Sequence, residues 1–156
     1  MTKLASDAAS VGLSIGECRC LRSLVALMIP ASSVYQMPGA DDEAIFGAIA
    51  STLDRDFDEV RQALWLLDAM AGGSFSDAPQ ATRHSVTERF QDQHAALAAV
   101  LVAVVTRCYY RDDRVMRAIG MEPRAPFPKG FEVEQGDWSL LDPVRARGRI
   151  YRDAPP

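Results

Sequence analysis

The sequence predicts an all-α protein: a small bundle of about five to six helices followed by a long, extended, proline-rich C-terminal tail. Apolar residues recur at steps of three and four positions through most of the first 120 residues, as on one face of a helix. No stretch alternates with period two for long enough to indicate a sheet. Beyond residue 120 the helical period stops, and six of the nine prolines lie between residues 121 and 156. We therefore expect a flexible N-terminus (1–15), a helical domain (16–120) and a tail (121–156).

Capping residues mark the first two helices. Ser14 and Glu17 have the spacing of a capping box, in which each side chain binds a backbone N–H that the first turn leaves free. The helix that follows ends at Pro30. Asp41 is a good N-cap for a second helix, because its carboxylate accepts hydrogen bonds from free backbone donors. The apolar face of that second helix is Ile45, Phe46, Ile49 and Leu53.

The remaining helices follow in the same way. A third helix begins near Asp56 and Glu59 and ends at Gly72, since glycine readily adopts the left-handed exit conformation. A more polar fourth helix covers residues 82–91. The fifth, residues 95–110, contains an apolar run too short to cross a bilayer, which needs about 20 residues, so we expect it to be buried on all sides. A short sixth helix runs from residue 113 to 119.

Composition limits the function. The 156 residues predict one domain, and a net charge of −4 argues against a nucleic-acid binder, which normally shows a basic surface. Three cysteines form an odd and sparse set that suits a reducing compartment. The first residues lack the apolar core of a signal peptide. We therefore expect a cytoplasmic protein, or a periplasmic one if it is exported bound to a partner that carries a signal.

Few residues suggest a metal or catalytic site. Cys18 and Cys20 would point about 200° apart on a helix, so both thiolates cannot reach one ion. His84 lies in the polar fourth helix and His94 precedes the apolar one, which suits surface and linking roles better than catalysis. Phosphate-binding loops, dinucleotide fingerprints and hydrolase signatures are absent from the sequence.

An enzyme that uses carboxylates is a further hypothesis. Asp112, Asp113 and Asp137 are the acidic residues that it would need. Such residues more commonly cap helices or form salt bridges, so we expect no catalytic, cofactor-binding or metal-binding residue in this chain.

The tail carries the strongest signal of function. Disordered segments lack large apolar side chains, yet this tail has several between its prolines. Either the tail packs on its own bundle, or part of it lies across another protein. Extended proline-rich segments suit binding because they lose little entropy when they are ordered. The expected partner-binding residues are the large apolar, proline and arginine side chains Tyr109, Tyr110, Pro126, Phe127, Pro128, Phe131, Trp138, Leu141, Pro143, Arg145 and Tyr151.

Four blocks of the sequence resemble a known family. They are LMIPAS (27–32), PGADDEAIF (38–46), CYYRDD (108–113) and PFPKGFEVEQGDWSLLDPVRAR (126–147). These blocks are similar to the gluconate 2-dehydrogenase subunit 3 family, the small subunit of FAD-dependent sugar and alcohol dehydrogenases. The likeness extends from about residue 21 to residue 152.

This resemblance implies a non-catalytic helical subunit without a redox group of its own. In the family, the small subunit pairs with a large FAD-containing subunit of the glucose-methanol-choline (GMC) oxidoreductase type, and some complexes add a cytochrome c subunit. The small subunit helps the large one to fold, mature or be exported, in a chaperone-like role. By this similarity the C-terminal block would lie on the flavoprotein. Several members carry a twin-arginine export signal, which this sequence does not show.

A second hypothesis belongs to another class of function. A free-standing helical protein could form homo-oligomers by exchanging its C-terminal tail between protomers. The sequence by itself leaves both hypotheses open.

Overall fold

The computed structural model describes residues 12–125, 127, 129–130 and 135–148, and all regular secondary structure in these residues is helical. These residues form seven α-helices and three short 3₁₀ segments, with one isolated β-bridge between Ser32 and Met37. The predicted all-α class is therefore confirmed. The chain divides into two compact units, residues 1–123, called the body, and residues 124–156, called the C-terminal unit.

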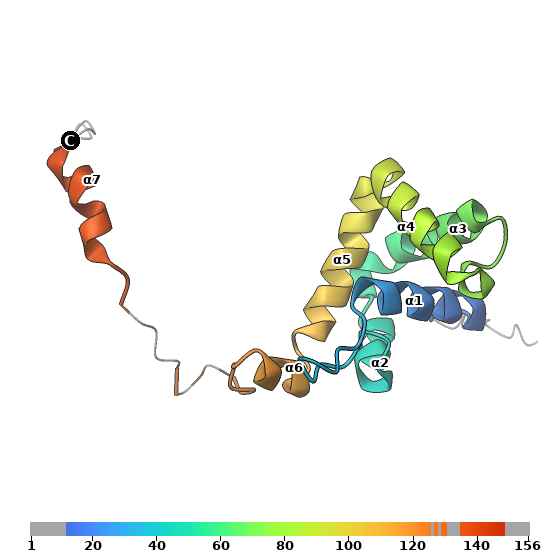
Figure 1. Cartoon of the computed structure of the whole chain (residues 1–156), viewed down its shortest axis with the longest axis horizontal. Coiled ribbons are helices and arrows are strands. Elements are labelled where there is room, and N and C mark those ends of the chain that lie inside the picture. Colours follow the sequence, from blue (N-terminus) through green and yellow to red (C-terminus); the bar gives the residue numbers. More distant parts are fainter. Residues whose placement is uncertain (1–11, 126, 128, 131–134, 149–156) are drawn as a thin grey trace, which may run out of the picture. The chain divides into compact units, whose positions relative to one another are not determined.

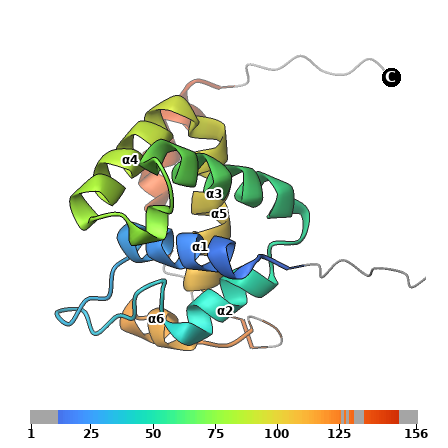
Figure 2. The same ribbon diagram turned by 90° about the vertical axis from the view of Figure 1, so that its right-hand side faces the viewer.

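The body contains six α-helices (Figure 1). They are α1 (Ile15–Met28), α2 (Glu43–Ser51), α3 (Phe57–Ala71), α4 (Gln80–Gln93), α5 (Ala95–Tyr109) and α6 (Asp113–Ala118). Helix α3 packs against α1, α4 and α5, and α5 also packs against α2 and α4. Figures 1 and 2 show α2 and α6 together at one end of α5, with α4 at the other end. None of the helices among the described residues has the length and apolar character required to cross a membrane.

Local capping explains where the helices begin and end. The Ser14–Glu17 capping box is formed, with the Ser14 amide donating to Glu17 Oε2 at 2.7 Å. The second helix is capped by Asp42 and not by Asp41, because the Asp42 carboxylate accepts from the amides of the first turn. Gly72 ends α3 with a left-handed φ of 75°, as expected.

The core is apolar and continuous. Its largest fully buried side chains include Phe75, Phe90 and Tyr109, around which the aliphatic faces of α1, α3 and α5 pack. Burying a side chain of this size contributes about 1.5–3 kcal/mol relative to leaving it in water. No polar or charged residue of the described chain is classed as buried. The body thus owes its stability to hydrophobic packing.

Helix α5 differs from its prediction. Leu101, Val104 and Val105 are buried, but the opposite face, which includes Ala99 and Val102, is exposed. The expectation of a helix buried on all sides was wrong. Alanines form much of the exposed face, and each offers little apolar area, so leaving that face uncovered costs less than the composition suggests.

Candidate functional site

Three of the four blocks that carry the family resemblance come together in the body. The loop from Pro30 to Asp42 joins α1 to α2, and it lies against the segment that joins α5 to α6. Tyr109 Oη donates to the carbonyl of Pro38 at 2.8 Å, and the amide of Ala40 donates to the carbonyl of Ile29 at 2.9 Å. We call this region, residues 29–42 with residues 108–114, the joint.

Gly39 allows the joint to close. A Cβ atom at this position would lie 2.9 Å from the amide nitrogen of Ala31 and would also overlap the side chain of Asp41. Only glycine lets two stretches of backbone approach this closely. The block PGADDEAIF therefore has a structural role here, which is to hold the start of α2 against the end of α1.

An arginine pairs with two helix caps in the same place. Arg114 donates to Asp42, the N-cap of α2, at 2.7 Å, and to Asp112, the N-cap of α6, at 2.9 Å. The hydrogen bonds from Arg114 lower the pKa of both carboxyl groups below the ordinary value for aspartate. Both stay ionised at neutral pH, so they serve as structural charges.

The proposed catalytic carboxylates all have such structural roles. Asp112 is a cap, Asp113 pairs with Arg117 at 3.1 Å one turn away, and Asp137 caps a 3₁₀ segment by accepting from Ser139. The hydrogen bond from the Ser139 hydroxyl lowers the pKa of Asp137. Asp112 and Asp113 lie in the body and Asp137 in the C-terminal unit, and each carboxylate is engaged by neighbours close to it in the sequence.

The cysteines and histidines are also separate from one another. Cys20 is buried, and burial raises the pKa of its thiol to about 12, which makes it a poor nucleophile. The His94 ring packs against Phe90 in a tilted arrangement, with ring centroids 5.4 Å apart, and His84 is exposed on α4. Within the described residues, no three His, Cys, Asp or Glu side chains are placed to share a metal ion.

Tyr109 and Tyr110 have different environments, although both were expected to bind a partner. Tyr109 is buried and bonded to Pro38, so its side chain cannot reach a partner at the surface. In this structure the Tyr109 ring is part of the core. Tyr110 meets Tyr109 edge to face and is half exposed, which leaves it accessible. Helical spacing could have predicted this difference in burial, because Tyr109 lies four positions after the buried Val105 and so falls on the same face of α5.

The C-terminal unit contains a short helical segment that the sequence analysis missed. A 3₁₀ turn (Trp138–Leu141) leads directly into α7 (Asp142–Ala146), and Gly148 follows with a left-handed φ of 69°. The available signals were a capping residue at Asp137 and proline in the first turn of α7, where its missing N–H costs nothing. We call residues 137–147 the tail helix.

The tail helix is fixed locally by polar side chains. Asp137 Oδ1 accepts from the Ser139 amide at 3.0 Å and from its hydroxyl at 2.6 Å. Trp138 Nε1 donates to Gln135 Oε1 at 3.2 Å, and Arg145 pairs with Asp142 at 3.2 Å. Upstream, Arg124 donates to the carbonyls of Ala125 and Gly130.

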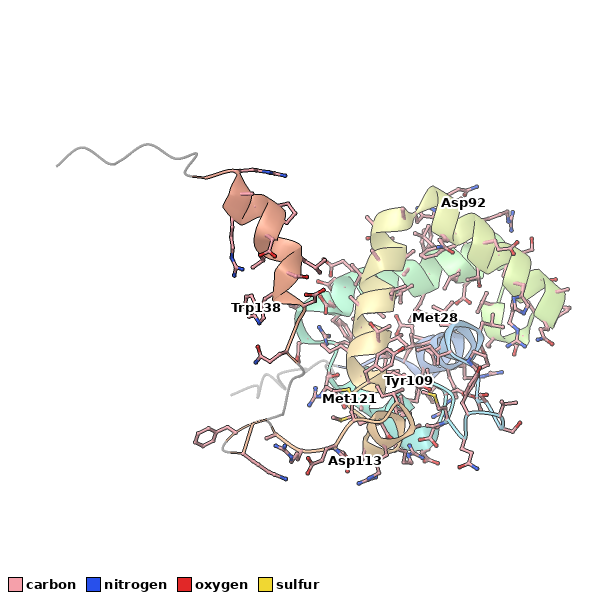
Figure 3. All side chains as sticks on the ribbon, turned by 60° about the vertical axis from the view of Figure 1, so that its left-hand side comes forward. Met28, Asp92, Tyr109, Asp113, Met121 and Trp138 are labelled. Atoms are coloured by element: carbon pink, nitrogen blue, oxygen red, sulfur yellow. The ribbon has the colours of Figure 1, made fainter. Side chains whose placement is uncertain are left out.

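Several apolar side chains among the described residues of this unit are open to solvent. Trp138, labelled in Figure 3, is 60% exposed, and Phe127 is 86% exposed. Leu140, Leu141 and Val144 are exposed as well. On a helical projection Leu140, Leu141, Val144 and Trp138 fall within about half of the circumference, so the tail helix has one apolar face.

The other predicted partner-binding residues lie partly on the tail helix and partly outside the described residues. Pro143 and Arg145 are exposed on the tail helix. Pro126, Pro128, Phe131 and Tyr151 lie outside the described residues. The accessible candidates in the described chain are therefore Tyr110, Phe127, Trp138, Leu141, Pro143 and Arg145.

The body has an apolar groove of its own. It lies between α1, α4 and α5 and has a volume of about 430 Å³. Its walls include Leu24 and Met28 of α1, Phe90 of α4, and Leu101 and Val102 of α5. The side chains that line it carry no charge, and only Thr87 and Gln91 offer polar groups. The exposed face of α5 thus forms part of this groove, which we call the α5 groove.

Comparison of the chain with family models, with curated proteins and with solved structures finds no match.

Proposed function

We propose that this chain is the non-catalytic small subunit of an FAD-dependent sugar or polyol dehydrogenase of the GMC type. It binds the large flavoprotein through its C-terminal unit and stabilises that subunit, or assists its maturation. The flavin and the catalytic groups belong to the flavoprotein, and a cytochrome c subunit completes the electron path in assemblies that have one. The resemblance of the four sequence blocks motivates this choice of family.

The observation that carries the proposal is the exposed apolar face of the tail helix. Large apolar side chains on a preformed helix gain free energy when a partner covers them, and tryptophan and arginine are the residues that most often dominate binding energy. The capping of the helix by Asp137 lowers the entropy that binding must overcome, because the segment is already ordered. A helix laid into an apolar groove of the flavoprotein fits these features.

The role in maturation follows from mass action. A partner that binds only the folded flavoprotein stabilises it by RT ln(1 + [L]/Kd), which is about 2.7 kcal/mol at a hundredfold excess over Kd. Such a contribution needs no chemistry from the small subunit. This is consistent with a body in which the conspicuous charged side chains are engaged in helix caps and salt bridges.

Co-expression tests the proposal. A GMC flavoprotein from the same genome is produced alone, with this chain, and with the Trp138→Ala variant. We expect soluble, FAD-loaded enzyme only with the wild-type chain, and a reduced yield with the variant. A flavoprotein that is equally soluble, FAD-loaded and active without this chain would refute the proposal.

The exposed tail helix also bears on homo-oligomers formed by tail exchange. Light scattering on the chain purified alone separates the two hypotheses. A discrete dimer in which Trp138 is protected from a fluorescence quencher favours exchange. A monomer with an accessible Trp138 favours a missing partner.

A further inference from the structure

The α5 groove has no role in the proposed function. Helices α4 and α5 diverge from the turn that joins them (Figure 1), and Leu24 and Met28 of α1 line the groove together with residues of both helices. Its volume of about 430 Å³ falls within the range of small-molecule sites, about 300–1,000 Å³. An apolar cavity of about 150 Å³ is already enough to hold benzene. The groove is therefore large enough for a small organic ligand.

Alanine residues of α5 leave this space open. Ala95, Ala99 and Ala103 line the groove at four-residue steps, so their methyl groups form a row along one side of the helix. Longer side chains at these positions would occupy the groove themselves. The row covers about 12 Å of helix at about 1.5 Å per residue, so the groove is elongated along α5.

The walls of the groove favour an uncharged ligand. Leu24, Phe90 and Leu101 contribute buried apolar side chains, and Met28 and Val102 contribute more exposed ones. In the described part of the chain, no charged side chain lines the groove. Moving a charged group from water to such walls costs free energy that no counter-charge offsets.

Two polar side chains line the α4 side of the groove. The Thr87 hydroxyl already donates to the carbonyl of Arg83 at 2.8 Å. Gln91 is exposed, and its carboxamide makes no hydrogen bond to another described residue. Gln91 lies four positions before Ala95, at the end of the groove where α4 joins α5. Because a carboxamide both donates and accepts, it can bind an uncharged hydroxyl or ester group at that end.

We propose that the α5 groove binds the aliphatic chain of an uncharged amphiphile, such as a fatty alcohol or a fatty-acid ester. The chain lies along the alanines of α5, and its polar end group meets Gln91. The length of about 12 Å corresponds to about ten bonds of an extended chain, at about 1.2 Å per bond. The inference concerns the body alone and does not depend on the flavoprotein.

A small ligand fits the groove better than a second protein does. Eleven residues line the groove, whereas a stable protein interface engages about 20–30 residues on each side. Tryptophan, tyrosine and arginine usually dominate binding energy at such interfaces. The exposed side chains that line the groove are instead alanine, valine and glutamine. These features favour an aliphatic chain over the surface of another macromolecule.

A series of primary alcohols from hexanol to dodecanol, titrated into the purified full chain by calorimetry, tests the inference. We expect one-to-one binding, with Kd falling about two- to fourfold for each added methylene up to about ten carbons. Beyond that length Kd should level off, because further methylenes remain in water. Decanoate, which has the same number of carbons and a charge, should bind severalfold more weakly than decanol.

Two substitutions on α5 form a matched pair. Ala99→Leu places a larger side chain in the groove, whereas Ala96→Leu places the same side chain at an exposed position of α5 outside it. We expect Ala99→Leu to raise the Kd for decanol by about tenfold or more, and Ala96→Leu to leave it unchanged. Both variants should remain folded, since both positions are exposed and leucine is a good helix former. Gln91→Ala should raise the Kd for decanol severalfold.

Nuclear magnetic resonance of the chain labelled at its alanine methyl groups locates the ligand. Decanol should shift the signals of Ala95, Ala99 and Ala103 and leave that of Ala96 in place. Several ligands per chain, or a Kd that keeps falling with chain length, would indicate non-specific partitioning and overturn the inference. So would equal binding of decanol by the wild-type chain and Ala99→Leu, or no binding at all. A homodimer that Ala99→Leu dissociates would assign the groove to a second copy, which also contradicts it.

Discussion

The body and the C-terminal unit treat aromatic side chains in opposite ways. In the body, Phe75, Phe90 and Tyr109 are buried among helices that were already expected to pack. In the C-terminal unit, Phe127 and Trp138 are exposed, although the helical segment that begins at Trp138 is capped by Asp137. The difference teaches that local order and burial are separate properties. The body provides its own hydrophobic stabilisation, whereas the tail helix is ordered by local hydrogen bonds while its apolar side chains stay exposed.

Adjacent tyrosines give the largest expected effect. Tyr109→Ala removes a buried ring and the hydrogen bond to Pro38, and should lower the free energy of unfolding by about 3 kcal/mol or more. Tyr110→Ala, one residue away and half exposed, should change it by less than about 0.5 kcal/mol. Chemical denaturation of the isolated chain measures both. Equal losses of stability would contradict the assignment of Tyr109 to the core and of Tyr110 to the surface.

Substitutions at the two tryptophans form a matched test and control for the role of the tail helix. If the proposed flavoprotein is the partner, Trp138→Ala should weaken binding to it by roughly 2 kcal/mol or more, while the melting temperature of the isolated chain stays the same. Trp65 of α3 is the control, because it is similarly exposed but lies on the body. Its replacement by alanine should leave the affinity nearly unaltered. A similar loss in both variants would remove the special role of the tail helix.

The salt bridges of the joint should give a smaller effect. Arg114→Met leaves two capping carboxylates without their counter-charge, and because the site is partly exposed we expect a loss of about 1 kcal/mol at neutral pH. Arg117→Met, whose pair with Asp113 is well exposed, should cost less than about 0.5 kcal/mol. Thermal unfolding near pH 7 compares the two.

Acid should remove the same contribution. Asp42 and Asp112 have pKa values lowered in the folded state, so their pairing with Arg114 stabilises the chain above about pH 4, the ordinary range of an aspartate. As the pH falls through the folded pKa values, that stability is lost. The wild-type chain should therefore approach the Arg114→Met variant in acid. A constant difference down to the lowest pH would contradict the assigned ion pairs.

The smallest effect is expected at the first capping box. Arg61 donates to Glu17 at 2.8 Å, and this hydrogen bond lowers the pKa of Glu17 to about 2. Glu17→Gln keeps an acceptor for the Ser14 amide but loses the charge, so we expect a loss of about 0.5 kcal/mol at pH 7. The sign of the shift places this stability above about pH 4, with its loss completed near pH 2. Urea unfolding of the wild-type chain and the Glu17→Gln variant, at pH 7 and near pH 2, measures this contribution.

Local features of the fold could be predicted from the sequence. The capping box at Ser14 and the glycine stop at Gly72 depend on residues within one turn, so their chemistry is visible in the sequence. The choice between Asp41 and Asp42 as the cap of α2 is not local in this sense. Arg114, far along the chain, pairs with Asp42, while Arg22 donates to the backbone carbonyl of Asp41.

The exposure of residues was harder to predict. Which face of α5 stays open depends on where α1 and α4 pack, because residues of all three helices line the α5 groove, and an alanine-rich helix gives no strong preference. The shape of the loop between α1 and α2 depends on Gln36, which has a left-handed φ of 52°, and glutamine does not indicate such a turn. The tail helix was not predicted because the many prolines of residues 121–156 indicated an extended chain, although Pro143 lies in the first turn of α7, where a helix accepts proline.

The α5 groove has a practical consequence for anyone who handles the chain alone. This open apolar groove, with a volume of about 430 Å³, can bind dyes such as anilinonaphthalene sulfonate, whose fluorescence rises in apolar surroundings. Strong dye fluorescence is commonly taken as the mark of a molten globule, but that state also loses its near-ultraviolet circular dichroism. A well-folded preparation of this protein should therefore increase the fluorescence of the dye while its near-ultraviolet circular dichroism remains intact.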